Sequence, residues 1–220
     1  YENDVLDSIK SLEMWLKLQK WYAQKRIPWK QGILLYGKPG TGKSSLARAI
    51  GEKYSLDIYT FRLSTFSDSE FQDRVFECLG RTPRIFLFED ADIPLELRKS
   101  NTSHMGETPL TLSTFLNTID GVKPLNNVFV IVTTNCIEKL DNALLRPGRL
   151  DEKIELKTLS PEGKKKVAEF ILGEWPEDAG KFASVKEDLT GAEFKEICIK
   201  HALQKKWEIH PSSIDTFKDK

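Results

Sequence analysis

A glycine-rich run from Gly37 to Ser44 constrains this chain more than any other feature. It reads Gly-Lys-Pro-Gly-Thr-Gly-Lys-Ser and fits the pattern G-x-x-x-x-G-K-[ST] of phosphate-binding loops. Glycines let the backbone curl until successive N–H groups converge on phosphate oxygens, and a helix that starts at Lys43 adds its positive end. We expect Lys43 to reach the β- and γ-phosphates of a nucleotide and the Ser44 hydroxyl to bind Mg²⁺.

The segments that flank this run argue against a chance glycine-rich turn. Residues 33–36 read Ile-Leu-Leu-Tyr, as a buried strand does, and residues 45–50 read Ser-Leu-Ala-Arg-Ala-Ile, as a helix does. A strand before the run and a helix after it are the context in which this motif holds phosphates. The sequence therefore predicts that the nucleotide is bound by Gly37, Lys38, Pro39, Gly40, Thr41, Gly42, Lys43, Ser44 and Ser45.

Strands and helices alternate along the first part of the chain. Pro28 ends a predicted opening helix, whose apolar residues recur at helical spacing: Val5, Ile9, Leu12 and Leu16, with Trp15 and Trp21 nearby. Apolar runs then predict strands over 58–61, 85–88, 128–133 and 154–156, and helical patterns predict helices over 69–79 and 109–119. Such alternation indicates an α/β fold, a parallel sheet layered between crossover helices.

The pattern changes after Ser160-Pro161. Helices are expected over 161–172 and 192–207, with no convincing strand. We predict a large α/β subdomain over residues 1–158, with a leading helix in 1–30, and a small helical lid over 159–220. The segment from Glu96 to Thr108 is polar and aperiodic, and we expect a mobile loop there.

Composition excludes several classes of protein. The chain has 33 basic and 33 acidic residues, so nothing in its charge balance draws it to nucleic acid or to an anionic membrane. No apolar run approaches the length of a membrane span. Metal-ligand spacing and C-x-x-C pairs are missing, which favours a reducing compartment and structural or surface roles for Cys78, Cys136, Cys198, His104, His201 and His210.

Polar residues follow two of the predicted strands. Glu89 and Asp90 come directly after one, with Asp92 nearby, and Thr133-Thr134-Asn135 ends the next. In a parallel sheet the carboxyl ends of the strands share one edge, where ligands bind. Phosphoryl hydrolysis needs one carboxylate to hold Mg²⁺ and another to orient the attacking water, and an amide at this edge can contact both the γ-phosphate and the water.

Two arginines flank a Pro-Gly turn in the run Arg146-Pro147-Gly148-Arg149. The turn would present both guanidinium groups close together on a surface. With no acidic partner expected in their own turn, they are suited to an external anion, such as the γ-phosphate held by a neighbouring copy.

Taken together, these motifs resemble the AAA family of ATPases over nearly the whole chain. The order of phosphate loop, acidic strand end, Thr-Thr-Asn and the run from Leu140 to Asp151 is that family's order of Walker A, Walker B, sensor 1 and second region of homology. Within the family the chain is most similar to the mitochondrial cytochrome bc complex assembly ATPases and their relatives. The shared features are Trp21-Tyr22 with residues 26–29, the order Glu89-Asp90-Ala91-Asp92, and residues 115–122, which read Phe-Leu-Asn-Thr-Ile-Asp-Gly-Val.

The resemblance implies an enzyme that hydrolyses ATP with Mg²⁺ on a P-loop fold of strand order 5-1-4-3-2. It implies that Ser44 and Glu89 hold the metal, that Asp90 activates water and that Asn135 is sensor 1. Arg146 and Arg149 would be arginine fingers delivered in trans. Gly191 and Ala192 resemble the start of the lid helix that lies near the nucleotide in many members, in place of a sensor 2 arginine.

Two features depart from the commoner pattern of the family. The usual order of the two acids is Asp then Glu, whereas this chain and the relatives named above have Glu89 then Asp90. Many unfoldases carry an aromatic-hydrophobic-Gly pore loop after the second strand, but here Phe66 is not followed by glycine. Phe66 either lines a pore or packs in the core as a helix staple, and we favour the core.

The expected function is ATP hydrolysis that drives conformational work on a protein client, of the chaperone, translocation or assembly type. An interface between a nucleotide site and a neighbour's arginines is heterologous and closes into a ring, of roughly six or seven identical subunits. Two alternatives stay open: a nucleic-acid-handling AAA machine, and a nucleotide-gated assembly switch with little turnover. No nucleic acid is expected, and a membrane would be reached only through a segment before Tyr1. The expected location is intracellular, either cytoplasmic or at the mitochondrial inner membrane.

Overall fold

The computed structural model describes residues 2–91, 110–121 and 123–209. Contacts between Cα atoms divide the chain into a larger unit, Glu2–Leu156, and a smaller unit that begins at Lys157. Several sequence-based expectations fall outside the described residues: Asp92, His104, His210 and the loop from Glu96 to Thr108.

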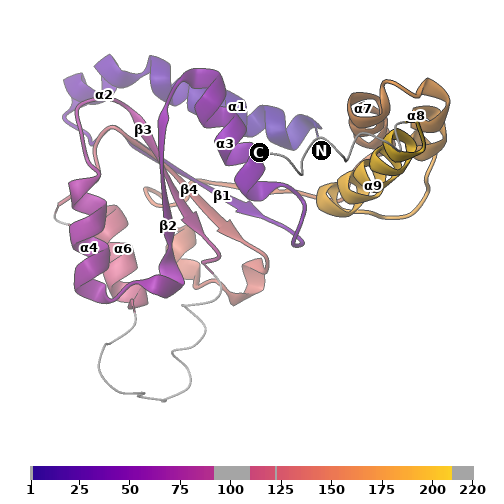
Figure 1. Cartoon of the computed structure of the whole chain (residues 1–220). Helices are drawn as coiled ribbons and strands as arrows, with labels where there is room; N and C mark the ends of the chain where they lie inside the picture. The colour runs from indigo at the N-terminus through magenta and orange to yellow at the C-terminus, as the bar shows by residue number, and fades with distance from the viewer. Residues whose placement is uncertain (1, 92–109, 122, 210–220) are drawn as a thin grey trace, which may run out of the picture. The chain divides into compact units, whose positions relative to one another are not determined.

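A parallel sheet forms the centre of the larger unit (Figure 1). Its strands within the described residues are β1 (Lys30–Tyr36), β2 (Asp57–Arg62), β3 (Arg84–Glu89), β4 (Val128–Thr134) and β5 (Glu152–Glu155). They lie in the order β2-β3-β4-β1-β5, and every neighbouring pair is parallel. This is the order that the resemblance implies, and it confirms the predicted α/β P-loop fold.

Helices cover both faces of the sheet (Figure 1). Because successive residues of a strand face opposite sides, the two faces of β4 can be followed separately. Val130 belongs to a buried cluster with Phe71 and Phe115. These two rings come from α4 (Asp68–Glu77) and α6 (Leu112–Asp120). Phe129 faces the other side, where the Trp15 ring of α1 (Glu2–Lys17) lies 5.5 Å away. On that side too is α3 (Lys43–Tyr54), the helix that leaves the glycine-rich run.

The opening helix differs from the prediction of one continuous element. It is divided at Leu18 into α1 and α2 (Gln19–Lys25), and α2 ends at Arg26 with φ 55°, in the left-handed region. No glycine or proline marks the division. Pro28 lies beyond the end of α2 and only prevents the helix from resuming.

Phe66 is part of a helix staple, as favoured from the sequence. Its ring centroid lies 5.9 Å from that of Phe71, which is the fourth residue of α4, and Phe66 directly precedes the N-cap Ser67. The Ser67 hydroxyl and backbone N–H both pair with the Glu70 carboxylate, which makes a capping box. This side chain therefore fixes the start of α4 against the core.

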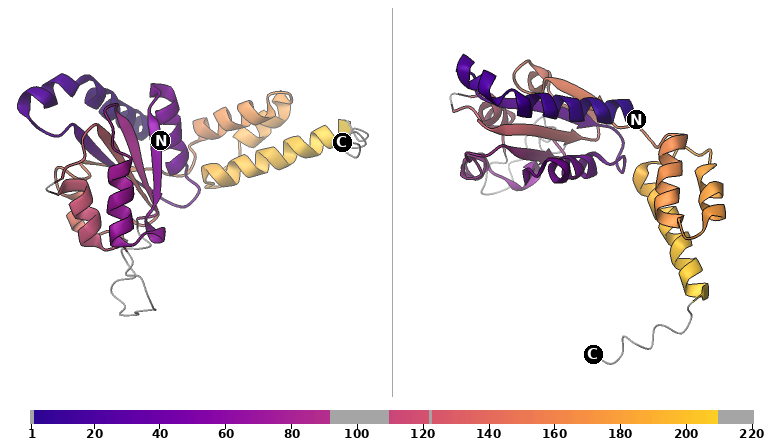
Figure 2. Two further views of the ribbon diagram at one scale, coloured as in Figure 1. Left: turned by 60° about the vertical axis from the view of Figure 1, so that its left-hand side comes forward. Right: turned by 90° about the horizontal axis from the view of Figure 1, so that it is seen from above.

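The smaller unit is helical. It contains α7 (Pro161–Leu172), α8 (Pro176–Ala183) and α9 (Gly191–Ile209), which lie side by side in both views of Figure 2. Ala168, Leu172 and Phe194 are fully buried between them. The buried Lys164 ammonium donates to the carbonyl oxygens of Val185 and Glu187, which fixes the segment between α8 and α9. The sequence analysis did not predict α8.

Candidate active site

The glycine-rich run leaves the carboxyl end of β1 and enters α3 at Lys43, as predicted. Its backbone requires glycine at three positions, since φ is 142° at Gly37, 80° at Gly40 and 99° at Gly42. At Gly37 a Cβ atom would also lie 2.2 Å from the carbonyl oxygen of Leu156. A backbone of this shape turns successive N–H groups toward one point, which is what a phosphate group needs.

The start of α3 adds to the positive character of this loop. Gly42, at the N-cap, has no side chain with which to satisfy the free N–H groups of the first turn, and that turn holds no acidic residue. The N–H groups at a helix start and the helix dipole favour an anion at this place. The loop and the helix start therefore fit the triphosphate of a nucleotide.

Lys43 lies over the loop with its charge directed inward. Its Nζ atom donates to the carbonyl oxygens of Gly37, at 2.7 Å, and Lys38, at 3.0 Å, and to Oδ1 of Asn135, at 2.8 Å. The whole residue is only 7% exposed. The cation thus joins the phosphate loop to the end of β4, which directly precedes Asn135.

Asn135 in turn joins Lys43 to the acidic end of β3. Its Nδ2 atom lies 3.5 Å from Oδ1 of Asp90, and the backbone N–H of Asp90 donates to Oγ1 of Thr133 at 3.3 Å. Asp90 has φ 53°. A non-glycine residue in that region costs roughly 1–3 kcal/mol, and such residues cluster at functional sites. Lys43, Asn135 and Asp90 are therefore connected at the carboxyl edge of the sheet.

Glu89 faces the helix that carries Ser44. Its Oε1 atom lies 4.0 Å from Nη2 of Arg48. Ser44 and Arg48 are four residues apart on α3 and so share one face of the helix, which turns the Ser44 side of α3 toward Glu89. A hydroxyl and a carboxylate are oxygen ligands of the kind that Mg²⁺ prefers. Arg48 was not singled out from the sequence, although its spacing from Ser44 could have indicated it.

The arginine turn lies at the opposite end of β1 from the phosphate loop. The backbone N–H of Asp151 donates to the carbonyl oxygen of Gly32 at 2.9 Å, and a Cβ atom on Gly32 would lie 1.8 Å from the carbonyl oxygen of Arg149. Gly32 precedes Gly37 by five strand residues, a path of about 16 Å. Arg149 is thus too far from the phosphate loop of its own chain for its side chain to reach it.

Arg149 has acidic and polar partners outside its own turn, which the turn's sequence did not indicate. Its Nε atom lies 3.5 Å from Oδ2 of Asp120, and its Nη1 atom donates to the carbonyl oxygen of Ala143 at 2.8 Å. Asp151 accepts from the backbone N–H of Gly148. Arg146 is exposed, and its side chain has no partner among the described residues. The two arginines therefore have different surroundings.

Asp120 is remote from Arg149 in the sequence, which is why the turn alone did not reveal the pair. It is the last residue of α6, within the Phe-Leu-Asn-Thr-Ile-Asp-Gly run that the resemblance had highlighted. Its approach to Arg149 depends on how α6 packs against the sheet.

The other residues considered in the sequence analysis lie in the smaller unit or form no group that could be a site. Gly191 and Ala192 begin α9, behind a capping box of Thr190 and Glu193, and a place beside the nucleotide stays a prediction. The described part of the chain holds no group of three or more His, Cys, Asp or Glu residues that could bind a metal. His201 pairs with Asp178 at 3.0 Å.

Lysines are clustered on α7, at residues 165 and 166, and on α9, at residues 205 and 206, and each of them pairs with a nearby acid. The ion pairs are Lys165 with Glu169, Lys166 with Glu162, Lys205 with Asp178 and Lys206 with Glu174. Paired lysines of this kind do not form the unbroken basic surface that phosphate backbones need.

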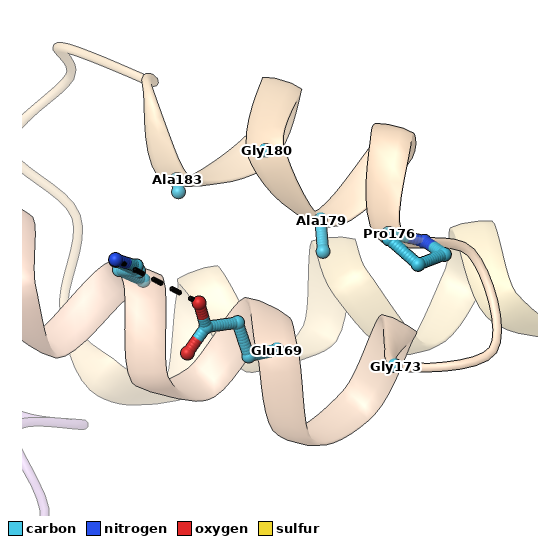
Figure 3. A pocket seen from close by; sticks show the side chains of 7 residues that line it. Glu169, Gly173, Pro176, Ala179, Gly180 and Ala183 are labelled. Carbon is cyan, nitrogen blue, oxygen red and sulfur yellow. Dashed lines mark ion pairs between the residues drawn. The ribbon is translucent and has the colours of Figure 1, made fainter.

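Figure 3 shows a groove in the smaller unit, between α7 and α8. It has a volume of about 410 Å³, and Gly173, Ala179, Gly180 and Ala183 form much of its wall. Its charged side chains, Lys165 and Glu169, pair with one another at 3.9 Å. The groove thus lacks the convergent N–H groups of the phosphate loop, and its one lysine is paired with an acid.

No helix that the structure describes has the length and apolar character needed to cross a bilayer.

Comparison with known proteins agrees with this geometry. The model of the family described as "ATPase family associated with various cellular activities (AAA)" matches residues 33–158. That range extends from β1 through the phosphate loop and the arginine turn to the end of the larger unit.

Curated relatives have about one third of their aligned residues in common with this chain. An AAA-ATPase of Arabidopsis thaliana is 36% identical over 74% of the chain, and a proteasome-activating nucleotidase of Sulfurisphaera tokodaii is 34% identical over 89%. A probable mitochondrial chaperone, bcs1 of Schizosaccharomyces pombe, is 33% identical over 77%. The chain spans 38%, 53% and 38% of the lengths of these three proteins, respectively.

Proposed function

This chain belongs to the AAA family of ATPases, and we propose that it hydrolyses ATP and that hydrolysis drives conformational work on a protein client within a ring of identical copies. The names of two relatives, a probable mitochondrial chaperone and a proteasome-activating nucleotidase, support a client that is a protein. The paired lysines of α7 and α9 give no support to a nucleic-acid client. We also propose a mitochondrial location, on the support of the chaperone's name.

In this proposal the phosphate loop binds the triphosphate of ATP. The backbone N–H groups of residues 37–45, except Pro39, which has none, contact the phosphate oxygens, and Lys43 places its charge against the β- and γ-phosphates. Ser44 and Glu89 supply oxygen atoms to Mg²⁺, which neutralises charge on the phosphates when it is bound. The support is the positive φ of three loop glycines and the side of α3 that faces Glu89.

Asp90 and Asn135 act on the water that attacks the γ-phosphate. The Asp90 carboxylate accepts a proton from the water, and the Asn135 amide orients the water and the γ-phosphate. Their support is the chain of contacts from Lys43 through Asn135 to Asp90. The left-handed backbone of Asp90 turns the chain away from β3 directly after the strand, which separates this carboxylate from that of Glu89.

The turn from Arg146 to Arg149 completes the site of a neighbouring copy. The observation that carries this part is that the turn and the phosphate loop lie at opposite ends of β1, so one chain cannot bring both to one nucleotide. An interface that joins two different surfaces repeats from copy to copy and closes into a ring, of roughly six or seven subunits in the family that the chain resembles.

A mixing experiment tests this arrangement. Arg146→Ala is expected to bind ATP normally and to hydrolyse it slowly, and Lys43→Ala is expected to lose binding or turnover. Rings formed from both variants contain some interfaces with an intact loop on one side and an intact Arg146 on the other, so phosphate release should partly return. Mixtures that co-assemble in native mass spectrometry but stay inactive would contradict the trans arrangement.

A further inference from the structure

Three charged side chains form a connected group at the end of β1 that is remote from the phosphate loop. Lys30 Nζ lies 3.4 Å from Oδ1 of Asp120, and Arg149 Nε lies 3.5 Å from Oδ2 of the same carboxylate. Asp120 thus forms an ion pair with a different cation at each of its two oxygens. A Cβ atom on Gly148 would lie 4.0 Å from Oδ1 of Asp120, so the carboxylate also borders the turn between the two arginines.

Lys30 is the buried member of this group. Its side chain is 8% exposed, and its ammonium also donates to the carbonyl oxygen of Ile119 at 2.7 Å. Burial lowers the pKa of this ammonium, and the charge of Asp120 opposes that shift. Lys30 is the first residue of β1, so it ties the end of α6 to the central part of the sheet.

Arg149 connects Asp120 to the segment that precedes Arg146. Two of its three guanidinium nitrogens have partners, Nε with Asp120 and Nη1 with the carbonyl oxygen of Ala143. Ala143 lies in a short 3-10 helix, Asn142–Leu145, which directly precedes Arg146. The backbone N–H of Arg149 donates to the carbonyl oxygen of Arg146 at 3.2 Å. Arg149 therefore holds the chain on both sides of Arg146.

We propose that Lys30, Asp120 and Arg149 are positioning residues, which fix the turn so that Arg146 contacts the nucleotide of the neighbouring copy. This inference rests on the trans arrangement of the proposed function and divides the labour between the two arginines. Arg146 is exposed and has no side-chain partner among the described residues, so it is available for an external phosphate. Arg149 is mostly buried, with 18% of its side chain exposed, and is occupied within its own chain.

Geometry rather than stability is what this group supplies. The Asp120 side chain is 43% exposed, so water can replace its carboxylate beside the two cations, and Lys30 keeps its hydrogen bond to Ile119. The loss of the Asp120 charge should therefore change the free energy of unfolding only modestly. A catalytic group displaced by about 1 Å can nevertheless lose roughly 100-fold in rate. Removing the Asp120 charge should therefore leave the fold intact and reduce turnover.

The test measures steady-state phosphate release by the full chain. Asp120→Asn is expected to lower kcat by about 10- to 100-fold while the KM for ATP stays within about twofold, since the neighbour's binding loop is untouched. Lys30→Met should do the same, and Lys30→Arg should restore most of the rate because a guanidinium can contact the same oxygen atoms. Glu77→Gln, which breaks the exposed pair of Arg74 and Glu77, is the matched control and should leave kcat unchanged.

A double-substitution cycle separates positioning from direct contact. If Arg149 acts only through this group, Asp120→Asn combined with Arg149→Met should be no slower than Arg149→Met alone. A normal kcat in Asp120→Asn would overturn the inference. So would a double variant in which the fold-loss of kcat equals the product of the fold-losses in the two single variants. Should Lys30→Met fail to fold, Asp120→Asn and the cycle still decide.

Arg146→Ala separates this inference from the proposed function. A normal kcat in that variant means that the trans arrangement itself is wrong. A slow Arg146→Ala beside a normal Asp120→Asn means that only the positioning role is wrong.

Discussion

The ammonium of Lys43 and the side-chain oxygen of Asn135 lie 2.8 Å apart, although 92 residues separate them in the chain. The contact joins the helix that follows β1 to the end of the adjacent strand β4. It brings the residue expected to hold the γ-phosphate against the residue expected to orient the water. A change at either one should therefore affect hydrolysis, in ways that differ between binding and turnover.

Asn135→Ala should separate binding from hydrolysis. Lys43 keeps its loop contacts to Gly37 and Lys38, so the affinity for ATP should stay within a few-fold. Loss of one positioned amide should lower kcat by about 100-fold. Equilibrium binding of a fluorescent ATP analogue and steady-state phosphate release measure the two effects. A weakened affinity together with a normal kcat would show that Asn135 serves binding alone.

The two acids at the end of β3 should differ in the step they support. Asp90→Asn should keep ATP bound and slow hydrolysis by roughly 100-fold or more, the scale of a positioned acid–base group. Glu89→Gln should weaken nucleotide binding only when Mg²⁺ is present. Binding titrations with and without EDTA, together with single-turnover hydrolysis, distinguish them. The roles are reversed if Glu89→Gln traps ATP while Asp90→Asn hydrolyses it normally.

Gly32→Ala should disturb the arginine turn from the strand beneath it. The added Cβ would lie 1.8 Å from the carbonyl oxygen of Arg149, so the turn must move, at a cost of about 3 kcal/mol in the free energy of unfolding. Gly180→Ala is the matched control, because no atom lies within 4 Å of the added Cβ and alanine favours the interior of α8. Thermal unfolding should show a lower Tm for Gly32→Ala and an unchanged or higher one for Gly180→Ala.

Asp178 should make the smaller unit sensitive to acid. Its hydrogen bond with His201, aided by Lys205 and Lys181, lowers the pKa of this carboxyl below the ordinary value of 3.8. A lowered pKa means that the contact stabilises the fold above pH 3.8 and that this stability is lost as the pH falls through the folded-state value. Between pH 5 and pH 3 the Tm of the wild-type chain should therefore fall further than that of Asp178→Asn. Parallel curves would show that the contact contributes nothing measurable.

The features recognised from the sequence are those encoded by neighbouring residues. The phosphate loop, the start of α3 at Lys43 and the central strands follow from glycine spacing and from short apolar runs. The observed strands differ from the predicted ones by a few residues at most, and β5 covers 152–155 where the sequence predicted 154–156. The staple of Phe66 was also favoured from the sequence, and the structure shows its local basis in the capping box of Ser67 and Glu70.

The features that were missed depend on contacts between distant segments or on weak local signals. Asp120 lies beside Arg149 only because the end of α6 lies beside the start of β1. No residue of the turn itself indicates this pairing. The segment of α8 is short and has a glycine inside it, so its helical pattern is faint. The division of the opening helix at Leu18 carries no glycine or proline signal at all.

The single strand β1 has a consequence for how such an enzyme responds to dilution. In the proposed trans arrangement the phosphate loop at one end of β1 and the arginine turn at the other belong to two different active sites. Each copy therefore contributes to two sites and contains no complete site of its own. If the trans arrangement holds, specific activity depends on the concentration of the protein itself. Dilution below the concentration at which the copies assemble should lower the specific activity, and adding ATP should not restore it.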